Sequence, residues 1–324
     1  MPSSVLASSC AMPDAREMAT ALPRLSLGSV ITVGTFDGVH RGHRDLLARV
    51  AARASARSLP SLLVTFDPHP LEVVNPTAAP PLLTTTEEKL EAIAESGLEY
   101  AAVVPFTPAL AALDAIEFVE RILLDRFCVR ELIIGYDHGF GRRRAGDVNM
   151  LRELGKRHDF LVGVVDAVSL NGLPVSSSAI RRAVSYGDLA GAHRMLGRRY
   201  AFSGRVGHGD ERGRLLGFPT LNVRIPSARK LLPPMGVYAV LVQSEHGSFG
   251  GMMNLGPRPT FGDLALSLEV HLFGASGDWY DSCVRVEFVE RLRDTMRFES
   301  PDALVTQLRA DERAARAALT QLEV

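Results

Sequence analysis

One stretch near the start of the chain limits the possible folds more than any other. Residues 30–33 form an apolar, β-branched run that is typical of a buried strand, and Gly34 and Gly38 then interrupt it. A helix is predicted next by apolar residues that recur every three or four positions: Leu46, Leu47, Val50, Ala51 and Ala54. A strand, a glycine-rich turn and a helix in this order direct backbone N–H groups and the positive end of the helix dipole at one point, where phosphate oxygens can bind.

Two histidines stand at the start of this helix. His40 and His43 are three positions apart in the first turn, so both rings can face one bound phosphate as hydrogen-bond donors. Gly42 lies between them and leaves the approach open. Histidines at this spacing also bind zinc or simply cap and pack a helix. Because no further cluster of metal ligands lies close by in the sequence, phosphate chemistry is the favoured interpretation.

Length and charge limit the number of domains and the kinds of partner that the chain can have. The 324 residues favour two domains over one. The 36 basic and 37 acidic residues nearly balance, so the total charge favours neither nucleic acid nor an anionic membrane as a partner. No apolar run reaches membrane-spanning length, and the N-terminal segment lacks the unbroken apolar core of a secretory signal. We therefore expect a tail over residues 1–26 and a cytoplasmic protein that acts on small molecules, with its oligomeric state unknown.

Strand and helix patterns alternate through the first half of the chain. Strands are predicted at 62–66, 101–105, 131–134 and 160–165, and helices at 86–96, 109–127 and 148–157. Thr85 and Glu88 form a capping-box pattern before the first of these helices. Repeated βαβ units predict a mostly parallel sheet covered by helices, that is, a Rossmann-like α/β domain over residues 27–186 with ligands at the carboxyl ends of its strands.

The pattern changes after about residue 186. Two helical segments, 178–185 and 188–196, precede short strands that glycine and proline interrupt, at 200–206, 237–242, 250–254, 266–273 and 284–289. Ser300 and Pro301 then begin the one clear helix at the end of the chain. Successive strands with one closing helix predict a small β-barrel with a C-terminal helix over residues 187–324.

Three further loops of the first half carry candidate binding residues. A proline-rich turn ends the second strand, a glycine- and arginine-rich loop follows the strand at 131–134, and three serines open a helix that has an arginine one turn further on. Each has a simpler interpretation as a turn, a solvated basic loop or a helix cap, and each can also bind phosphate. Their candidate residues are His69, Asp137, Ser177, Ser178 and Arg181.

These segments resemble nucleotidyltransferases with an H-x-G-H signature, and the string G-T-F-D-G-V-H-R-G-H resembles the bacterial bifunctional riboflavin kinase/FAD synthetase family in particular. The other loops resemble that family's F-x-P-H-P, G-x-[DN]-F-x-F-G and I-S-S-T-x-x-R motifs, with His138 in place of Phe and Ser178 in place of Thr. The resemblance implies in-line adenylyl transfer from ATP to FMN, with His40 and His43 as catalytic donors. It implies that substrates are bound by Gly34, Phe36, Asp37, Gly42, His69, Asp137, Ser177, Ser178 and Arg181.

A second dense motif lies in the barrel half. Its many glycines can simply be barrel corners. Thr220 and Asn222, however, are two positions apart, so in a strand their oxygen atoms face the same side, as a magnesium site requires. The string G-F-P-T-L-N resembles the G-F-P-T-A-N signature of riboflavin kinase. The resemblance implies Mg²⁺ at Thr220 and Asn222, and substrate binding by Gly204, Gly217, Phe218 and Pro219.

The segment L-S-L-E-V-H-L at 266–272 alternates so that Ser267, Glu269 and His271 share one face of a strand. By pattern alone, Glu269 is most simply a solvent-facing carboxylate. The segment also resembles the family's E-V-H-L segment, which implies that Glu269 is the catalytic base for riboflavin's 5′-hydroxyl. The chain departs from the family pattern at three positions on the expected flavin side: Gly274, Asp281 and Thr295.

The resemblance extends over about residues 28–320, with the motifs in the family's order. It implies a bifunctional enzyme that phosphorylates riboflavin to FMN with ATP and then adenylylates FMN to FAD, releasing pyrophosphate. Mg²⁺ is the expected cofactor, and ATP, riboflavin and FMN are the expected substrates. Two alternatives remain. A nucleotidyltransferase for another substrate would leave Thr220, Asn222 and Glu269 without a role, and a flavin-binding regulator would bind without turnover.

Overall fold

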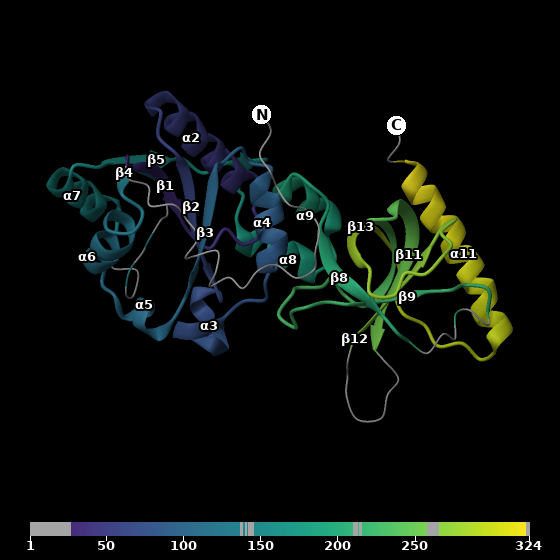
Figure 1. The fold of residues 1–324 in the computed structure, drawn as a ribbon. Helices are drawn as coiled ribbons and strands as arrows, with labels where there is room; N and C mark the ends of the chain where they lie inside the picture. Colours follow the sequence, from purple (N-terminus) through teal and green to yellow (C-terminus); the bar gives the residue numbers. More distant parts are fainter. Residues whose placement is uncertain are drawn as a thin grey trace. The chain divides into compact units, whose positions relative to one another are not determined.

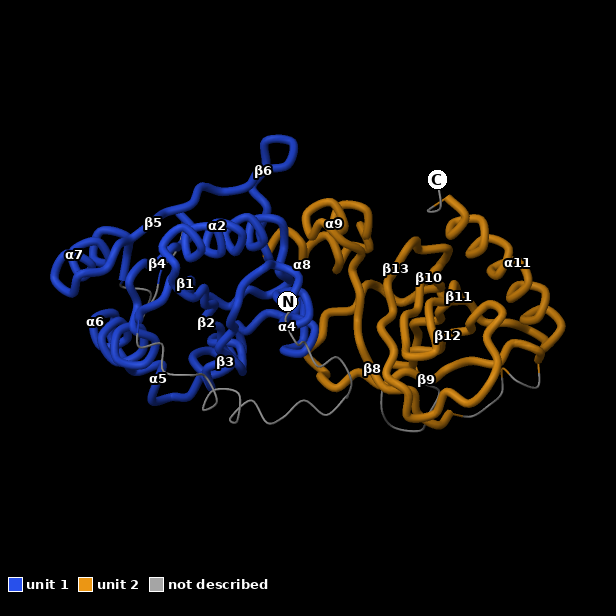
Figure 2. Tube along the Cα trace, turned by 45° about the horizontal axis from the view of Figure 1, so that its top comes forward, with its two compact units in different colours: residues 1–177 blue, residues 178–324 orange. Residues whose placement is uncertain are grey.

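The chain forms two compact units, residues 1–177 and 178–324 (Figure 2). The computed structural model describes residues 27–136, 139, 141, 146–209, 213, 216–257 and 266–321, so the predicted N-terminal tail lies outside the described residues. The sequence pattern suggested a boundary after residue 186. The compact units divide earlier, at the start of α8 (Ser177–Ser185), and α9 (Leu189–Leu196) follows within the second unit. None of the helices in the described part of the chain has the length and apolarity that a membrane crossing requires.

The first unit is built on a parallel sheet of five strands, in the order β3-β2-β1-β4-β5 (Figure 1). The strands are β1 (Ser29–Val33), β2 (Ser61–Asp67), β3 (Tyr100–Pro105), β4 (Val129–Gly135) and β5 (Leu161–Val165). The chain winds from β1 outward to β3 and then returns to β4 on the other side of β1, which places the topological switch point beside β1. The predicted Rossmann-like α/β domain is confirmed.

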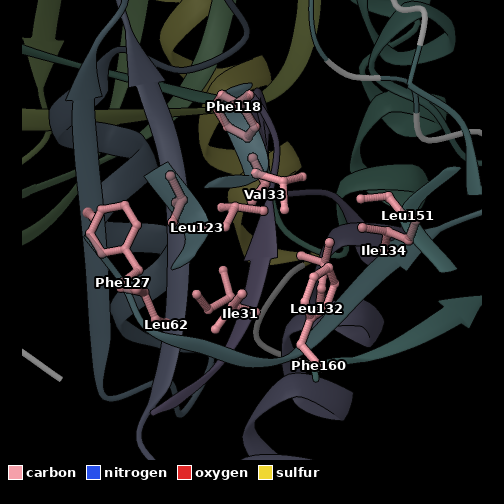
Figure 3. Close-up of a cluster of buried hydrophobic side chains, with 14 of the residues drawn as sticks. Ile31, Val33, Leu62, Phe118, Leu123, Phe127, Leu132, Ile134, Leu151 and Phe160 are labelled. Carbon is pink, nitrogen blue, oxygen red and sulfur yellow. The ribbon is translucent and has the colours of Figure 1, made fainter. Parts of the chain in front are cut away.

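Helices cover both faces of this sheet, which explains why its strands are apolar on both sides. On one face lie α2 (Arg41–Arg57) and α4 (Thr86–Ala94), and on the other lie α6 (Ala115–Phe118), the π-helical segment η2 (Val119–Leu124) and α7 (Val148–His158). Figure 3 shows the apolar cluster on the face that α6, η2 and α7 cover, in which Phe118, Leu123 and Leu151 surround strand residues such as Ile31. The smaller elements are α3 (Pro70–Val74), η1 (Pro76–Ala78), α5 (Pro108–Ala112), β6 (Ser169–Leu170) and β7 (Leu173–Pro174).

The prediction of one continuous helix over residues 109–127 is wrong. The backbone becomes extended at Leu113, which ends α5, and the side chain of Asp114 then accepts a hydrogen bond from the backbone N–H of Glu117. Glu117 returns a bond to the backbone N–H of Asp114, so the two residues form a capping box that starts a new helix. The apolar spacing continued across this break and hid it.

The second unit is a closed barrel of antiparallel strands, in the order β10-β11-β12-β9-β8-β13. The strands are β8 (Ala201–Gly207), β9 (Leu221–Arg224), β10 (Gly236–Ser244), β11 (Gly247–Pro257), β12 (Leu266–Leu272) and β13 (Cys283–Arg293). Phe202, Tyr238 and Phe288 are fully buried, and the rings of Phe202 and Tyr238 both pack against that of Phe288. α11 (Pro301–Thr320), capped by Ser300, packs against β10, β11 and β13 (Figure 1). The predicted barrel with a C-terminal helix is confirmed.

Each unit ties one helix to its sheet through a buried carboxylate. In the first unit, Glu131 on β4 accepts hydrogen bonds from Arg53 (Nε to Oε1, 2.8 Å) and Arg57 (Nη1 to Oε2, 2.9 Å) on α2. In the second, Asp311 on α11 accepts a bidentate pair of bonds from Arg293 on β13, at 2.8 and 2.6 Å. Both carboxylates are almost fully buried, and charge-assisted hydrogen bonds from the arginines replace the water that each lost on burial.

Candidate functional site

The first candidate site is the turn between β1 and α2. His40 is the N-cap of α2, and its Nδ1 atom accepts a hydrogen bond from the backbone N–H of His43 at 3.3 Å. In the neutral ring, the proton is therefore on Nε2. The imidazole of His43 stacks on that of His40, with ring centroids 3.6 Å apart and an interplanar angle of 15°. The structure thus brings both predicted histidines together at the positive end of a helix dipole.

Aromatic and glycine residues hold these rings in place. Phe36 is buried in a left-handed conformation (φ +50°), and its ring centroid lies 4.7 Å from that of His43. A Cβ atom on Gly34 would come within 3.0 Å of the Phe36 ring, and a Cβ atom on Gly42 would come within 3.3 Å of the His40 ring. Side chains at either glycine would therefore displace the aromatic stack.

Asp37 and Ser177 hold the turn to neighbouring segments. The buried carboxylate of Asp37 accepts hydrogen bonds from the backbone N–H groups of Leu83 (3.0 Å) and Thr84 (2.9 Å) and from the Thr84 hydroxyl (3.1 Å). The hydroxyl of Ser177 donates to the backbone carbonyl of Asp37 at 2.9 Å. Both residues were predicted to bind substrate, and in the structure these polar atoms brace the loop that presents the histidines.

His69 stands where β2 ends, and β2 lies next to β1 in the sheet. Its Nδ1 atom accepts a hydrogen bond from the backbone N–H of Leu71 at 3.2 Å, which makes it the N-cap of α3. Its own backbone N–H donates to Glu72 at 3.3 Å. The segment is therefore a capped turn, with His69 and not Asp67 as the N-cap of α3. It leaves the same edge of the sheet as the histidine turn, and the predicted role of His69 in substrate binding stays a prediction.

Lys89 on α4 is a residue that the sequence interpretation missed. Its side chain is almost fully buried, and Nζ donates to the Thr65 hydroxyl (3.1 Å), the Phe66 carbonyl (3.1 Å) and the Thr35 carbonyl (3.4 Å). Burial lowers the pKa of Lys89, and the nearby carboxylates of Asp37, Asp67 and Glu87 oppose this shift. A usable signal was present, because Lys89 lies on the helix face that buries Ala92 and Ile93.

Three other predicted residues of this half remain predictions. Asp137 lies outside the described residues. Ser178 and Arg181 belong to α8 within the second compact unit, where Ser178 is exposed and Arg181 is half-buried.

The second candidate site lies on the outer face of the barrel. Glu269 on β12 pairs with Asn222 on β9 and with Asn254 on β11. Directly opposed residues of antiparallel strands point to the same face. The sequence neighbours Leu268 and Val270 are buried, so Glu269 and its two partners point outward. Asn254 had no predicted role, because only the strand register reveals that it opposes Glu269.

Two glycines ahead of β9 lie close to the side chains of Asn222 and Thr220. A Cβ atom on Gly209 would lie 2.0 Å from Nδ2 of Asn222, and one on Gly213 would lie 3.5 Å from Oγ1 of Thr220. Because they lack side chains, Gly209 and Gly213 allow the backbone to approach Asn222 and Thr220 closely, and we call this arrangement the cradle. Among the described residues there is no cluster of three or more His, Cys, Asp or Glu side chains that could hold a metal ion, so a cation here would depend on hydroxyl, amide and substrate oxygens, as magnesium does in nucleotide sites.

Two neighbours of Glu269 on β12 orient the site. The buried Ser267 donates its hydroxyl to Oε1 of Glu269 at 2.9 Å. His271 bonds through Nδ1 to the carbonyl of Pro219 at 2.8 Å, so Nδ1 carries the proton, and its ring contacts Phe218 edge-on at 5.2 Å. β12 therefore fixes both the carboxylate and the loop that leads to Thr220.

The two predicted glycines of this half differ in their surroundings. A Cβ atom on Gly204 would lie 2.5 Å from the carbonyl of Arg224, so Gly204 permits the close approach of β8 to β9. Gly217 has φ +82°, a left-handed conformation that favours glycine, and a Cβ atom there would meet no neighbouring atom.

Comparison with known protein families assigns one family to each half. Residues 23–179 match the family model described as FAD synthetase, and residues 196–319 match the one described as riboflavin kinase. The first match contains the histidine turn and Lys89. The second contains the cradle and Glu269.

Individual proteins match nearly the whole chain. A bifunctional riboflavin kinase/FMN adenylyltransferase of Pseudomonas fluorescens is 42% identical over 90% of this chain and 93% of its own. The protein of the same name from Escherichia coli (strain K12) is 40% identical over 89% of this chain and 92% of its own. A crystal structure of a macrolide-efflux protein from Streptococcus pneumoniae superposes with a TM-score of 0.79 at 30% identity, covering 89% of this chain and 94% of that chain.

Proposed function

Because the chain belongs to the family of bifunctional riboflavin kinases/FMN adenylyltransferases, we propose that its two activities are carried by the two groups of residues described above. The enzyme phosphorylates riboflavin to FMN with ATP, and it adenylylates FMN to FAD with release of pyrophosphate. The observation that carries the assignment is that each family match contains one group: the stacked histidines lie within residues 23–179, and the Asn222–Glu269 pair lies within residues 196–319.

In the α/β unit, the reaction is attack of an FMN phosphate oxygen on the α-phosphorus of ATP. A new P–O bond forms to FMN, and the bond from the α-phosphorus to the bridging oxygen of pyrophosphate breaks. The FMN phosphate is already ionised, so no general base is required. His40 and His43 donate hydrogen bonds to the charge that develops, supported by the N-terminus of α2. Phe36 and Gly34 keep the rings stacked in the donating position.

In the barrel, the 5′-hydroxyl of riboflavin attacks the γ-phosphorus of a second ATP, and ADP leaves with the electrons of the broken P–O bond. This hydroxyl does carry a proton, and Glu269 accepts it. The hydrogen bond from Ser267 holds the carboxylate of Glu269 in one orientation. Asn254, opposite Glu269 on the same face, is placed to contact the substrate beside the base.

Mg²⁺ belongs to the proposal for the barrel site. Oγ1 of Thr220 and Oδ1 of Asn222 would hold the ion together with phosphate oxygens, and the ion supplies positive charge that neutralises the triphosphate. The cradle left by Gly209 and Gly213 supports this assignment. The remaining proposed contacts to the substrates are made by Asp37, Gly42, His69, Asp137, Ser177, Ser178, Arg181, Gly204, Gly217, Phe218 and Pro219. We also propose a cytoplasmic location, where ATP is available, and cell fractionation tests it.

The test is to incubate the full-length protein with riboflavin, ATP and Mg²⁺ and to identify the flavins over time by chromatography. FMN should appear first and FAD afterwards, and supplied FMN should yield FAD and pyrophosphate. A protein that binds riboflavin and FMN but produces neither product would be a regulator. A protein that produces pyrophosphate from ATP only with another acceptor would be a nucleotidyltransferase for a different substrate. Either outcome would overturn the proposal.

A further inference from the structure

We propose that Lys89 is a positioning residue for FMN adenylylation, because its buried ammonium group joins the two loops that form the adenylyl-transfer site. This inference rests on the proposed function, which assigns that reaction to the histidine turn. Lys89 itself lies on α4, outside every sequence motif that identifies the site, and it is separated from the histidines by more than forty residues of chain.

The geometry places the ammonium group where two adjacent strands end. The Thr35 carbonyl belongs to the turn that follows β1, while Thr65 and the Phe66 carbonyl belong to the last residues of β2. The hydroxyl of Thr65 also donates to the Thr35 carbonyl at 3.1 Å, so the two strand ends are linked directly as well as through Lys89. One cation therefore fixes the point at which both loops leave the sheet.

Two short segments of chain connect this point to the histidine stack and to the turn that His69 caps. Thr35 precedes Phe36, whose ring lies against that of His43. Phe66 is followed by Asp67, whose carboxylate accepts a hydrogen bond from the Thr86 hydroxyl at 2.9 Å, and then by the turn that His69 caps. A shift of the Thr35 carbonyl would move Phe36 and the histidine stack with it. Displacements of about 1 Å at such groups cost about 10²-fold in rate.

The charge of Lys89 matters because three acceptors surround Nζ. An ammonium group donates three hydrogen bonds, whereas a neutral amine donates only two. Deprotonation would leave one buried acceptor at the strand ends without its donor, which costs free energy. The carboxylates whose charge acts on Nζ are Asp37 after β1, Asp67 at the end of β2, and Glu87 on α4 itself.

The direction of the pKa shift separates a positioning role from a purely structural one. Burial lowers the pKa of Lys89 below its ordinary value of 10.5. The unfolded chain therefore binds more protons than the folded chain in the alkaline range, so the contribution of Lys89 to folding stability rises with pH. Its contribution to positioning falls over the same range, since the third hydrogen bond is lost. If Lys89 had only a structural role, folding stability and adenylylation activity would change in the same direction as the pH rises.

The experiment measures FMN adenylylation by the full-length protein as a function of pH, with riboflavin phosphorylation in the same preparation as the internal control. The wild type should lose adenylylation on the alkaline side with a midpoint below pH 10.5. Lys89→Met should lower kcat/KM for adenylylation about 10- to 100-fold, remove this alkaline limb and leave phosphorylation unchanged. Thermal unfolding, followed at each pH, reports whether the α/β unit remains folded.

Thr65 provides a matched pair of variants in case Lys89→Met does not fold. Thr65→Ser keeps the hydroxyl that accepts from Nζ, and the alkaline midpoint should stay in place. Thr65→Val removes this acceptor, so the pKa of Lys89 should fall further and the midpoint should move to lower pH. A midpoint that is the same in Thr65→Val and Thr65→Ser would overturn the proposal, as would a folded Lys89→Met enzyme with wild-type adenylylation.

Failure of the proposed function would look different. If His43→Ala retains adenylylation, the histidine turn is not the site, whatever the Lys89 variants do. If His43→Ala is inactive while folded Lys89→Met is fully active, the site is correct and only the role of Lys89 is refuted.

Discussion

The two units of this protein form their proposed sites in different ways. In the α/β unit, the site is a turn at the end of a strand, and its main residues lie within ten consecutive positions, from Gly34 to His43. In the barrel, the site lies on the face of the sheet, and its residues come from three strands that only the hydrogen-bonding register brings side by side.

This difference determines what holds each site in shape. Besides the helix cap by His40 within it, the turn depends on supports outside itself: the bonds from Leu83 and Thr84 to the Asp37 carboxylate, and the buried Lys89. In the barrel site, the backbone ladder sets the spacing of Asn222 and Glu269, and the supporting bonds of Ser267 and His271 come from β12 itself. The two activities should therefore be separable. Loss of a support outside the turn should impair FAD formation, whereas phosphorylation should depend on residues of the barrel strands.

The largest expected effect is that of Glu269→Gln on the barrel. The amide cannot accept the proton of riboflavin's 5′-hydroxyl, so kcat for phosphorylation should fall by about 10²- to 10⁴-fold. Conversion of supplied FMN to FAD should be unchanged. Separate assays with riboflavin and with FMN measure the two steps.

Ser267→Ala is the matched control for this variant. It removes the hydrogen bond that orients the carboxylate but keeps the base, so phosphorylation should fall less than in Glu269→Gln. Wild-type phosphorylation by Glu269→Gln would exclude this residue from the mechanism, and parallel loss of FAD formation would refute the separability of the sites.

His43→Ala should produce the reciprocal result with a somewhat smaller effect. Loss of one preorganised donor to the developing charge costs about 10²- to 10³-fold in kcat. FAD formation should therefore nearly cease, while FMN accumulates from riboflavin at the wild-type rate. Chromatography of a single incubation with riboflavin shows both effects. Equal loss of both steps would mean that the units do not work independently.

The same contrast explains how much could be predicted from the sequence. The α/β fold followed from alternating strand and helix patterns, the barrel from successive short strands with one closing helix, and the histidine turn from a local motif. Strand register and loop contacts are not local, so Asn254 and Lys89 remained hidden. The break at Leu113 was missed because apolar spacing continues through it. Asp281 stands where the family pattern has glycine, and the structure gives it φ +61°, a conformation that Asp tolerates better than most residues.

Asn222→Ala tests the proposed Mg²⁺ site at the cradle, and its expected effect on phosphorylation is smaller. Loss of one oxygen ligand should raise the Mg²⁺ concentration needed for half-maximal phosphorylation by about 10- to 100-fold. Activity should recover at high Mg²⁺, which a collapsed barrel would not allow. The Mg²⁺ dependence of FAD formation should stay the same, because Asn222 lies in the barrel and not in the turn. An unchanged Mg²⁺ requirement for phosphorylation would remove Asn222 from the metal site.

The smallest effect concerns the buried Glu131, which ties α2, and with it the histidine turn, to β4. Its carboxylate is 5% exposed, but Arg53 and Arg57 are 52% and 34% exposed, so water can solvate both arginines after the charge is removed. Glu131→Gln should therefore cost only about 1 kcal/mol in the free energy of unfolding of the α/β unit.

Asp45→Asn is the control for this variant, because the Asp45–Arg49 pair lies on the same helix with both side chains exposed, and its loss should change stability by less than about 0.5 kcal/mol. Denaturant titration of both variants, with each activity followed as a probe, measures the difference. If the turn depends on supports outside itself, Glu131→Gln should lose FAD formation at a lower denaturant concentration than the wild type, while phosphorylation by the barrel ends at an unchanged concentration. If both activities were lost at the same lowered denaturant concentration, the barrel would depend on the same supports as the turn.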